Sequence, residues 1–145
     1  MYDILRHAHS GLRWLVLIAL LVAIVSAFSK KGKSPYTAGD KKLALIALIF
    51  THLQLVIGFI LYFISPKVVF DGAAMKDSVL RFYLVEHMAL MLVAIVLITI
   101  GYSKAKRLTD DSKKFAKIGW FYLIGLILIL ISIPWPFRNL GGSWF

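Results

Sequence analysis

Four long stretches of this chain contain no charged side chain, and this feature restricts its fold more than any other. They are 16, 24, 17 and 20 residues long, and they cover Trp14–Ser29, Leu43–Pro66, His87–Ser103 and Ile118–Phe137. A helix needs about 20 mostly apolar residues to cross the hydrocarbon core of a bilayer. The second and fourth stretches reach that length alone. The other two reach it with one or two turns of mixed residues before them.

The composition excludes an ordinary soluble domain. Of the 145 residues, 60% are hydrophobic and only 17% are charged, against about 25% charged in a typical soluble domain. A soluble chain this short cannot bury so much apolar surface. We therefore expect an all-α protein, an integral membrane up-down-up-down four-helix bundle in which the first and third helices, and the second and fourth, face each other diagonally. The expected spans of this single domain, 1–145, are about 8–29, 43–65, 80–103 and 118–136.

The distribution of charge predicts the orientation. The net charge is +10, and 11 of the 17 basic residues lie in the linkers 30–42 and 104–117. The positive-inside rule places both linkers in the cytoplasm and both termini outside, and we expect the bacterial cytoplasmic (inner) membrane. The charge is thus explained by topology and by attraction to the lipid bilayer, and no nucleic acid partner is expected. Trp14, Trp135 and Trp144 then lie on the outer side, where interfacial aromatic rings are typical.

Small and polar residues recur at helical spacing along the second, third and fourth spans. Helices in lipid pack through such residues, so these stripes predict the inward faces. Taken alone, the pattern favours plain packing over a ligand site. The stripes are Thr51, Gln54, Gly58, Tyr62 and Ser65; then Tyr83, His87, Met91, Ala94, Ile98 and Gly101; then Tyr122, Gly125, Ile129 and Ser132.

Three of the four histidines, His9, His52 and His87, lie within or at the mouth of the expected spans. An ionisable side chain inside a membrane is costly, so each is a functional-site hypothesis by default. Histidine is also the usual axial ligand of haem, and bundles build cofactor sites from facing helices. Because cysteine is absent, thioether-linked haem and iron–sulfur clusters are excluded. We expect haem b, although a neutral histidine bonded to a neighbouring helix is the alternative for each position.

Depth along the helices selects one histidine pair. At 1.5 Å per residue, His9 and His87 lie roughly 9 Å and 10 Å from the outer ends of diagonal helices, whereas His52 lies roughly 20 Å deep. His9 and His87 are therefore the predicted metal ligands, with His52 as the runner-up. Gly58, at roughly 11 Å, is level with the expected iron and leaves space for a porphyrin. His7 points about 200° away from His9 on the same helix.

Arg13 and Glu86 are the remaining informative charges. Arg13 lies one turn below His9, where a lone charge is expensive. It is expected to neutralise a haem propionate, to pair with Glu86, or to extend outward to the membrane interface. Glu86 directly precedes His87 and has three candidate roles, which are orienting a ligand, relaying protons near a quinone, or lying at the interface.

Short motifs carry a resemblance to known membrane proteins. The chain contains HxxxRW (His9, Arg13, Trp14), HLQLVIG from His52 to Gly58, and EH at Glu86. With these it resembles the small four-helix membrane proteins of the cytochrome b-like family and, more distantly, one four-helix half of haem A synthase. In that synthase each half has a histidine near the outer end of two helices, and a Q-x-x-x-G pattern on the helix between them.

The resemblance implies a role for each matching residue. His9 and His87 would bind haem jointly, with Gln54 and Gly58 as the intervening cofactor-binding pattern. The catalytic synthase half carries a glutamate in an outer loop before its first histidine, whereas only Asp3 precedes His9 here. We therefore expect an electron carrier of cytochrome b type rather than a stand-alone enzyme, with quinol as a candidate partner. The alternative is a cofactor-free accessory or assembly subunit, and in both cases a larger membrane complex is expected.

The predicted orientation has a direct test. A reporter that is active only outside the cytoplasm is expected to be active when it is fused after Phe145, because both basic linkers are expected inside. Activity of a cytoplasm-specific reporter at the same fusion point would contradict this orientation.

Overall fold

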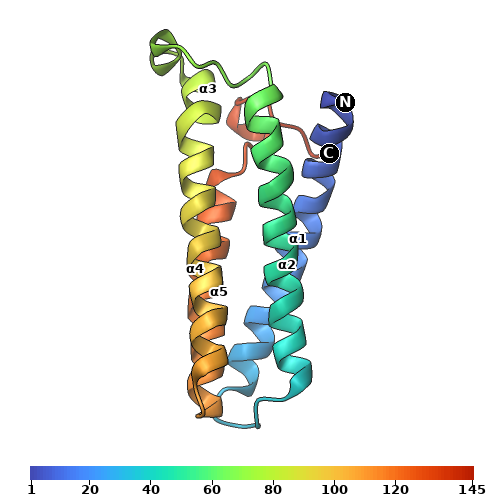
Figure 1. The fold of residues 1–145 in the computed structure, drawn as a ribbon, viewed down its shortest axis with the longest axis vertical. Helices are drawn as coiled ribbons and strands as arrows, with labels where there is room; N and C mark the ends of the chain where they lie inside the picture. Colours follow the sequence, from blue (N-terminus) through green and yellow to red (C-terminus); the bar gives the residue numbers. More distant parts are fainter.

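The computed structural model, which describes residues 1–145, is a bundle of four long helices (Figure 1). The first two are α1 (Tyr2–Lys30) and α2 (Ala38–Ile64), and the last is α5 (Asp111–Ser132). The third is continuous from Ser78 to Arg107, and each of the four is long and apolar enough to cross a membrane. The expected all-α bundle of four membrane helices is thereby confirmed.

The third helix has three parts. These are α3 (Ser78–Arg81), a π-helical turn η2 (Phe82–Glu86) and α4 (His87–Arg107). Two short 3₁₀ helices, η1 (Gly72–Lys76) and η3 (Pro136–Arg138), lie in the loop before α3 and after α5. A π-turn accommodates one extra residue in a helix and is often found at functional sites. Here it directly precedes His87.

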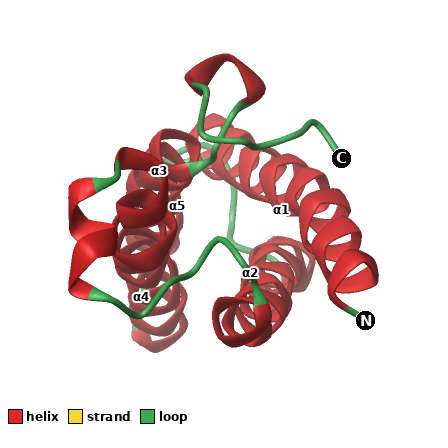
Figure 2. Cartoon of the chain, turned by 90° about the horizontal axis from the view of Figure 1, so that it is seen from above, coloured by secondary structure: helices red, strands yellow, loops and turns green.

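The chain termini mark one end of the bundle, which we call the terminal end (Figure 1). The linkers 31–37 and 108–110 lie at the opposite end, which we call the basic end. The closest neighbours are α4 with α5, α1 with α2 and α1 with α5, whereas α2 and α4 approach each other less closely. Viewed from above, α1 therefore lies diagonally opposite α4, and α2 opposite α5 (Figure 2).

Local chemistry sets the helix ends. The Thr37 hydroxyl accepts from the Asp40 N–H, and the Asp40 carboxylate accepts from the Thr37 N–H, which is a capping box that starts α2 at Ala38. The last helix ends at Ser132, four residues before the end expected from hydropathy. Pro134 and Pro136 cause the difference because proline has no N–H to continue the helix. The uncharged stretch continues past this point, but the helix does not.

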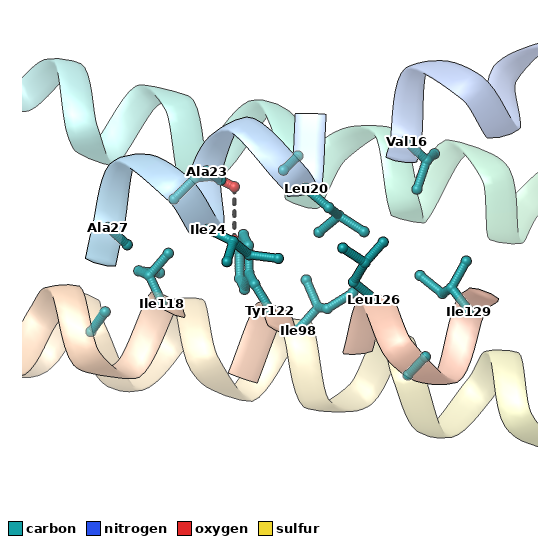
Figure 3. Close-up of a cluster of buried hydrophobic side chains, with 14 of the residues drawn as sticks. Val16, Leu20, Ala23, Ile24, Ala27, Ile98, Ile118, Tyr122, Leu126 and Ile129 are labelled. Atoms are coloured by element: carbon teal, nitrogen blue, oxygen red, sulfur yellow. Dashed lines mark hydrogen bonds between the residues drawn. The ribbon is translucent and has the colours of Figure 1, made fainter. Parts of the chain in front are cut away.

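The middle of the bundle is closely packed (Figure 3). Alanines buried at the helix contacts allow the backbones to approach closely, and the larger buried side chains fill the centre. The Tyr122 hydroxyl on α5 donates to the Ala44 carbonyl oxygen on α2 at 2.7 Å, the bond drawn dashed in Figure 3. This bond joins two diagonal helices through the core. The buried members include Leu20, Ala23, Ala27, Ala44, Ala47, Ala94, Ile98, Phe115 and Tyr122.

The contact between α4 and α5 gives a stability prediction. A Cβ added at Gly125 would lie 2.6 Å from Ile98 Cγ1 and 3.3 Å from the Ala94 carbonyl oxygen. We expect Gly125→Ala to lower the free energy of unfolding by about 1–3 kcal/mol, because the packed helices must separate. Thermal unfolding in detergent micelles measures the change.

Gly11→Ala is the matched control. A Cβ at Gly11 on α1 meets nothing within 4 Å, so this substitution is expected to be neutral or to stabilise the helix by up to about 1 kcal/mol. Equal melting temperatures for the two alanine variants would contradict the packing described.

Candidate functional site

The half of the bundle nearer the terminal end encloses a cavity. Its volume is about 170 Å³, more than ten times the roughly 10–15 Å³ that one water molecule requires. Side chains from all four long helices line it, together with residues that follow α2 and α5, and no aspartate or glutamate is among them. The polar and charged lining side chains include Arg6, His9, Arg13, Gln54, Tyr62, Lys67, Tyr83 and His87.

His9 and His87 meet across this cavity. They come from the diagonal helices α1 and α4, their ring centroids are 6.4 Å apart, and their ring planes are inclined by 72°. Two imidazoles that bind one metal ion from opposite sides have centres about 6 Å apart, because each metal–nitrogen bond is about 2 Å long and each ring adds about 1 Å. The pair that depth arithmetic selected is therefore brought together at a spacing that suits shared coordination.

The His87 ring is fixed by the end of α5. Its Nδ1 donates to the Ser132 carbonyl oxygen at 2.8 Å. In a continuous helix that oxygen would accept from the N–H of residue 136, but Pro136 has none. A carbonyl can only accept, so the proton is on Nδ1 and the lone pair is on Nε2. Metal-binding histidines are typically held in this way.

His9 is positioned by α2 but has no polar partner for its ring. Gln54 Nε2 donates to the His9 backbone oxygen at 2.8 Å. A Cβ at Gly58 would lie 2.9 Å from His9 Cε1. The space left by Gly58 thus accommodates the His9 ring, whereas helix depth alone predicts that it leaves room for a porphyrin. Both His9 Nδ1 and Gln54 Oε1 are buried without a hydrogen-bond partner, an arrangement that is costly unless a ligand completes it.

The other two histidines lie away from the cavity. His52 Nδ1 is 2.8 Å from the Leu48 carbonyl oxygen on its own helix, and its Nε2 is 3.4 Å from the hydroxyl of Thr99 on α4. His52 therefore connects α2 to α4 and does not line the cavity. His7 is exposed, and its Nε2 lies 3.1 Å from Arg6.

Arg13 holds the C-terminal segment, residues 139–145, which we call the C-terminal strap. Its guanidinium donates to the carbonyl oxygens of Ser143 at 3.1 Å and Trp144 at 2.7 Å. The Trp14 indole donates to the same Trp144 oxygen at 3.0 Å. The guanidinium carbon also lies 5.5 Å from the Trp14 ring centroid and 5.6 Å from that of Trp135, within the range of a cation–π contact. Sequence reasoning did not anticipate these backbone partners.

Two further side chains fasten the strap beside the cavity. Lys67 Nζ donates to the Gly141 carbonyl oxygen at 2.5 Å, and the Tyr83 hydroxyl donates to that of Leu140 at 2.9 Å. Because Gly141 and Ser143 also line the cavity, the strap forms part of its wall. Figure 2 shows the segment after α5 turning back across the terminal end of the bundle.

Positive charge gathers at the mouth of the cavity. Lys67 lies in the loop after α2, and its pKa is lowered by burial and, to a smaller degree, by the charge of Arg6. Arg6 Nε is buried and makes no hydrogen bond, although it lies 3.7 Å from a carboxylate oxygen of Asp3, which does not line the cavity. Glu86 forms a salt bridge with Arg81 at 2.8 Å, and it forms none with Arg13 or with the cations at the mouth of the cavity. A pair of cations without a carboxylate in the cavity suits an anionic group.

No protein-family model, curated protein or solved structure matches this chain.

The strap contacts predict a change in proteolysis. Arg13→Ala removes two charge-assisted hydrogen bonds, each worth about 1.5–3 kcal/mol. We expect chymotrypsin to cleave the strap at Leu140 or Trp144 at least about tenfold faster in this variant, because local opening becomes more frequent. Arg6→Ala, which removes an arginine of the same helix that does not bond to the strap, is expected to leave the cleavage rate unchanged. Equal rates in Arg13→Ala and the wild-type protein would contradict the assigned role of Arg13.

Proposed function

We propose that the protein is a membrane-embedded b-type haem protein that transfers electrons near the outer face of the bilayer, with one haem between His9 and His87. The observation that carries this proposal is the meeting of the two rings, 6.4 Å apart, across a cavity between diagonal helices. A bundle core in which facing helices each supply a ligand is a common place for such a cofactor.

The residues present fit a haem in four respects. His87 has a fixed tautomer with Nε2 unprotonated, and His9 Nδ1 is buried without a partner. Apolar side chains such as Met88, Met91 and Ile95 supply the surroundings that a macrocycle requires. Finally, no carboxylate in the lining would repel the propionates.

Each cationic residue near the cavity has a role in this proposal. Arg6 and Lys67, at the mouth, would hold the propionates by charge-assisted hydrogen bonds. Arg13 has its terminal nitrogen engaged by the strap, whereas its buried Nε has no partner and is a further donor for a propionate. By tying down the strap, Arg13 also keeps water from the cavity. When bound, the haem supplies the one-electron chemistry, and the protein supplies ligands, burial and charge.

An exposed aromatic cluster supports quinol as the redox partner. Phe59 and Tyr62 of α2 line the cavity. The ring centroid of Phe59 lies 5.1 Å from that of Phe63, and the ring centroid of Tyr62 lies 5.3 Å from that of Phe70. Phe59, Phe63 and Phe70 are 52%, 61% and 62% exposed. Flat aromatic rings beside the cavity suit the head of a lipid-soluble quinol. We propose that this electron transfer with quinol takes place within a larger membrane complex.

Replacing one ligand tests the haem assignment. His9→Ala is expected to convert a low-spin spectrum into a high-spin or haem-free one, because bis-imidazole ligation needs both rings. Added imidazole is expected to restore the low-spin bands by filling the space left by the side chain. The visible spectrum of the purified variant measures both effects. His87→Ala is expected to behave alike, with an added loss of stability because the Ser132 carbonyl oxygen loses its donor.

His52→Leu and His7→Ala are the controls. Both are expected to keep one low-spin haem, because His52 is bonded outside the cavity and His7 is exposed. Retention of low-spin haem in both His9→Ala and His87→Ala would contradict the proposal. Loss of haem in His52→Leu alone would favour His52 as a ligand instead.

A further inference from the structure

A second cavity lies at the basic end of the bundle, separate from the histidine cavity. Its volume is about 190 Å³. Residues from four parts of the chain converge on it, namely the loop before α2, the first turn of α2, the last turns of α4 and the first turn of α5. The lining residues are Tyr36, Thr37, Ala38, Lys41, Tyr102, Ala105, Lys106 and Lys114.

The cavity carries positive charge that the protein itself does not neutralise. Lys41, Lys106 and Lys114 come from α2, α4 and α5, and none of them forms a salt bridge. Asp40, which directly precedes Lys41, is buried and already bound to Lys30 at 2.6 Å and to Thr37. Three lysines on three different helices therefore surround one hollow with no internal counterion.

Neutral donors complete the cavity. The hydroxyls of Tyr36 and Tyr102 make no hydrogen bond within the chain, unlike those of Tyr62, Tyr83 and Tyr122. Burial raises the pKa of Tyr36 to about 12, with smaller contributions from Tyr102 and Asp40. The Tyr36 hydroxyl thus stays protonated and can donate at any physiological pH. The Lys114 ammonium lies 5.3 Å from the centroid of the Tyr36 ring, so the two groups flank the same space.

The position of the cavity favours a ligand that belongs to the membrane. It lies where four long apolar helices end and polar linkers begin, the level at which lipid headgroups lie. Basic pockets between transmembrane helices are typical binding sites for anionic headgroups. The apolar stems of the lysines that line the cavity can cover the upper part of an acyl chain.

We propose that this cavity binds the phosphate of an anionic phospholipid headgroup, held by the three lysines and the two tyrosine hydroxyls. Soluble phosphate shares the charge and the acceptor oxygens but lacks the acyl chains that place a lipid at this level. The proposal is independent of haem binding, because the two cavities share no residue.

Two triple variants with the same net charge test the proposal. Lys41, Lys106 and Lys114 are changed to Gln in the pocket variant. Lys31, Lys33 and Lys42, which are basic and exposed but do not line the cavity, are changed to Gln in the control variant. Each protein is placed in phosphatidylcholine nanodiscs containing a minor fraction of phosphatidylglycerol, and native mass spectrometry counts the phosphatidylglycerol retained after release. A Tyr36→Phe, Tyr102→Phe double variant tests the hydroxyls without removing charge.

We expect the wild-type protein and the control variant to retain one phosphatidylglycerol. The pocket variant is expected to bind it at least about tenfold more weakly, since each lysine near an anionic surface contributes roughly a fivefold factor. The tyrosine double variant is expected to bind several-fold more weakly. Equal retention of phosphatidylglycerol by the two triple variants would overturn the proposal, because only a diffuse attraction between the basic linkers and anionic lipid would remain. Displacement of the lipid by millimolar inorganic phosphate would overturn the assignment to a lipid source.

Discussion

A hydrogen bond from His87 to the last carbonyl group of α5 connects the fold of this protein to its candidate site. Two prolines end α5 and leave the Ser132 oxygen without a helical donor, and an unpaired carbonyl is expensive in a membrane protein. His87 supplies the donor at 2.8 Å. The same bond fixes the orientation of the imidazole ring and leaves its Nε2 free to bind a ligand. Nearby, Trp135 and Arg138 satisfy the Leu130, Ile131 and Ile133 oxygens, so side chains cap the whole helix end.

The bundle is closely packed in its middle and hollow in the half nearer the terminal end, because different residues occupy the same helix faces. In the middle of the bundle the inward positions are mostly alanine, glycine and branched aliphatic residues, which pack closely. Towards the terminal end they become histidine, glutamine, tyrosine and arginine, which line the histidine cavity. The C-terminal strap then covers part of the hollow half. It is held chiefly through its backbone oxygens, so its course depends on donors from α1, the α2–α3 loop and η2.

Much of the architecture and the central pair of residues could be predicted from the sequence. Uncharged runs set the four helices, and the 1.5 Å rise placed His9 and His87 at one depth because that arithmetic needs only the helix starts. The diagonal arrangement followed from short linkers. The same reasoning set His52 apart from the pair, and the structure places it between α2 and α4.

The strap and its contacts could not be predicted, because they depend on backbone carbonyl groups that every residue carries. Nothing in the side-chain pattern distinguishes Ser143 or Trp144 as an acceptor for Arg13. No residue pattern in the sequence predicts the π-turn before His87. The depth of Gly58 in the sequence predicts space for a porphyrin beside it. Its neighbour is the His9 ring, however, and helix depth alone cannot distinguish a ring from a macrocycle.

The most direct test of the central proposal is the haem content and visible spectrum of the purified wild-type protein, produced in cells that make haem. The proposal predicts one non-covalently bound haem per chain, with a sharp Soret band that shifts on reduction by dithionite and low-spin bands in the reduced state. A folded, colourless protein that takes up no haem on titration would contradict it and would favour a cofactor-free subunit.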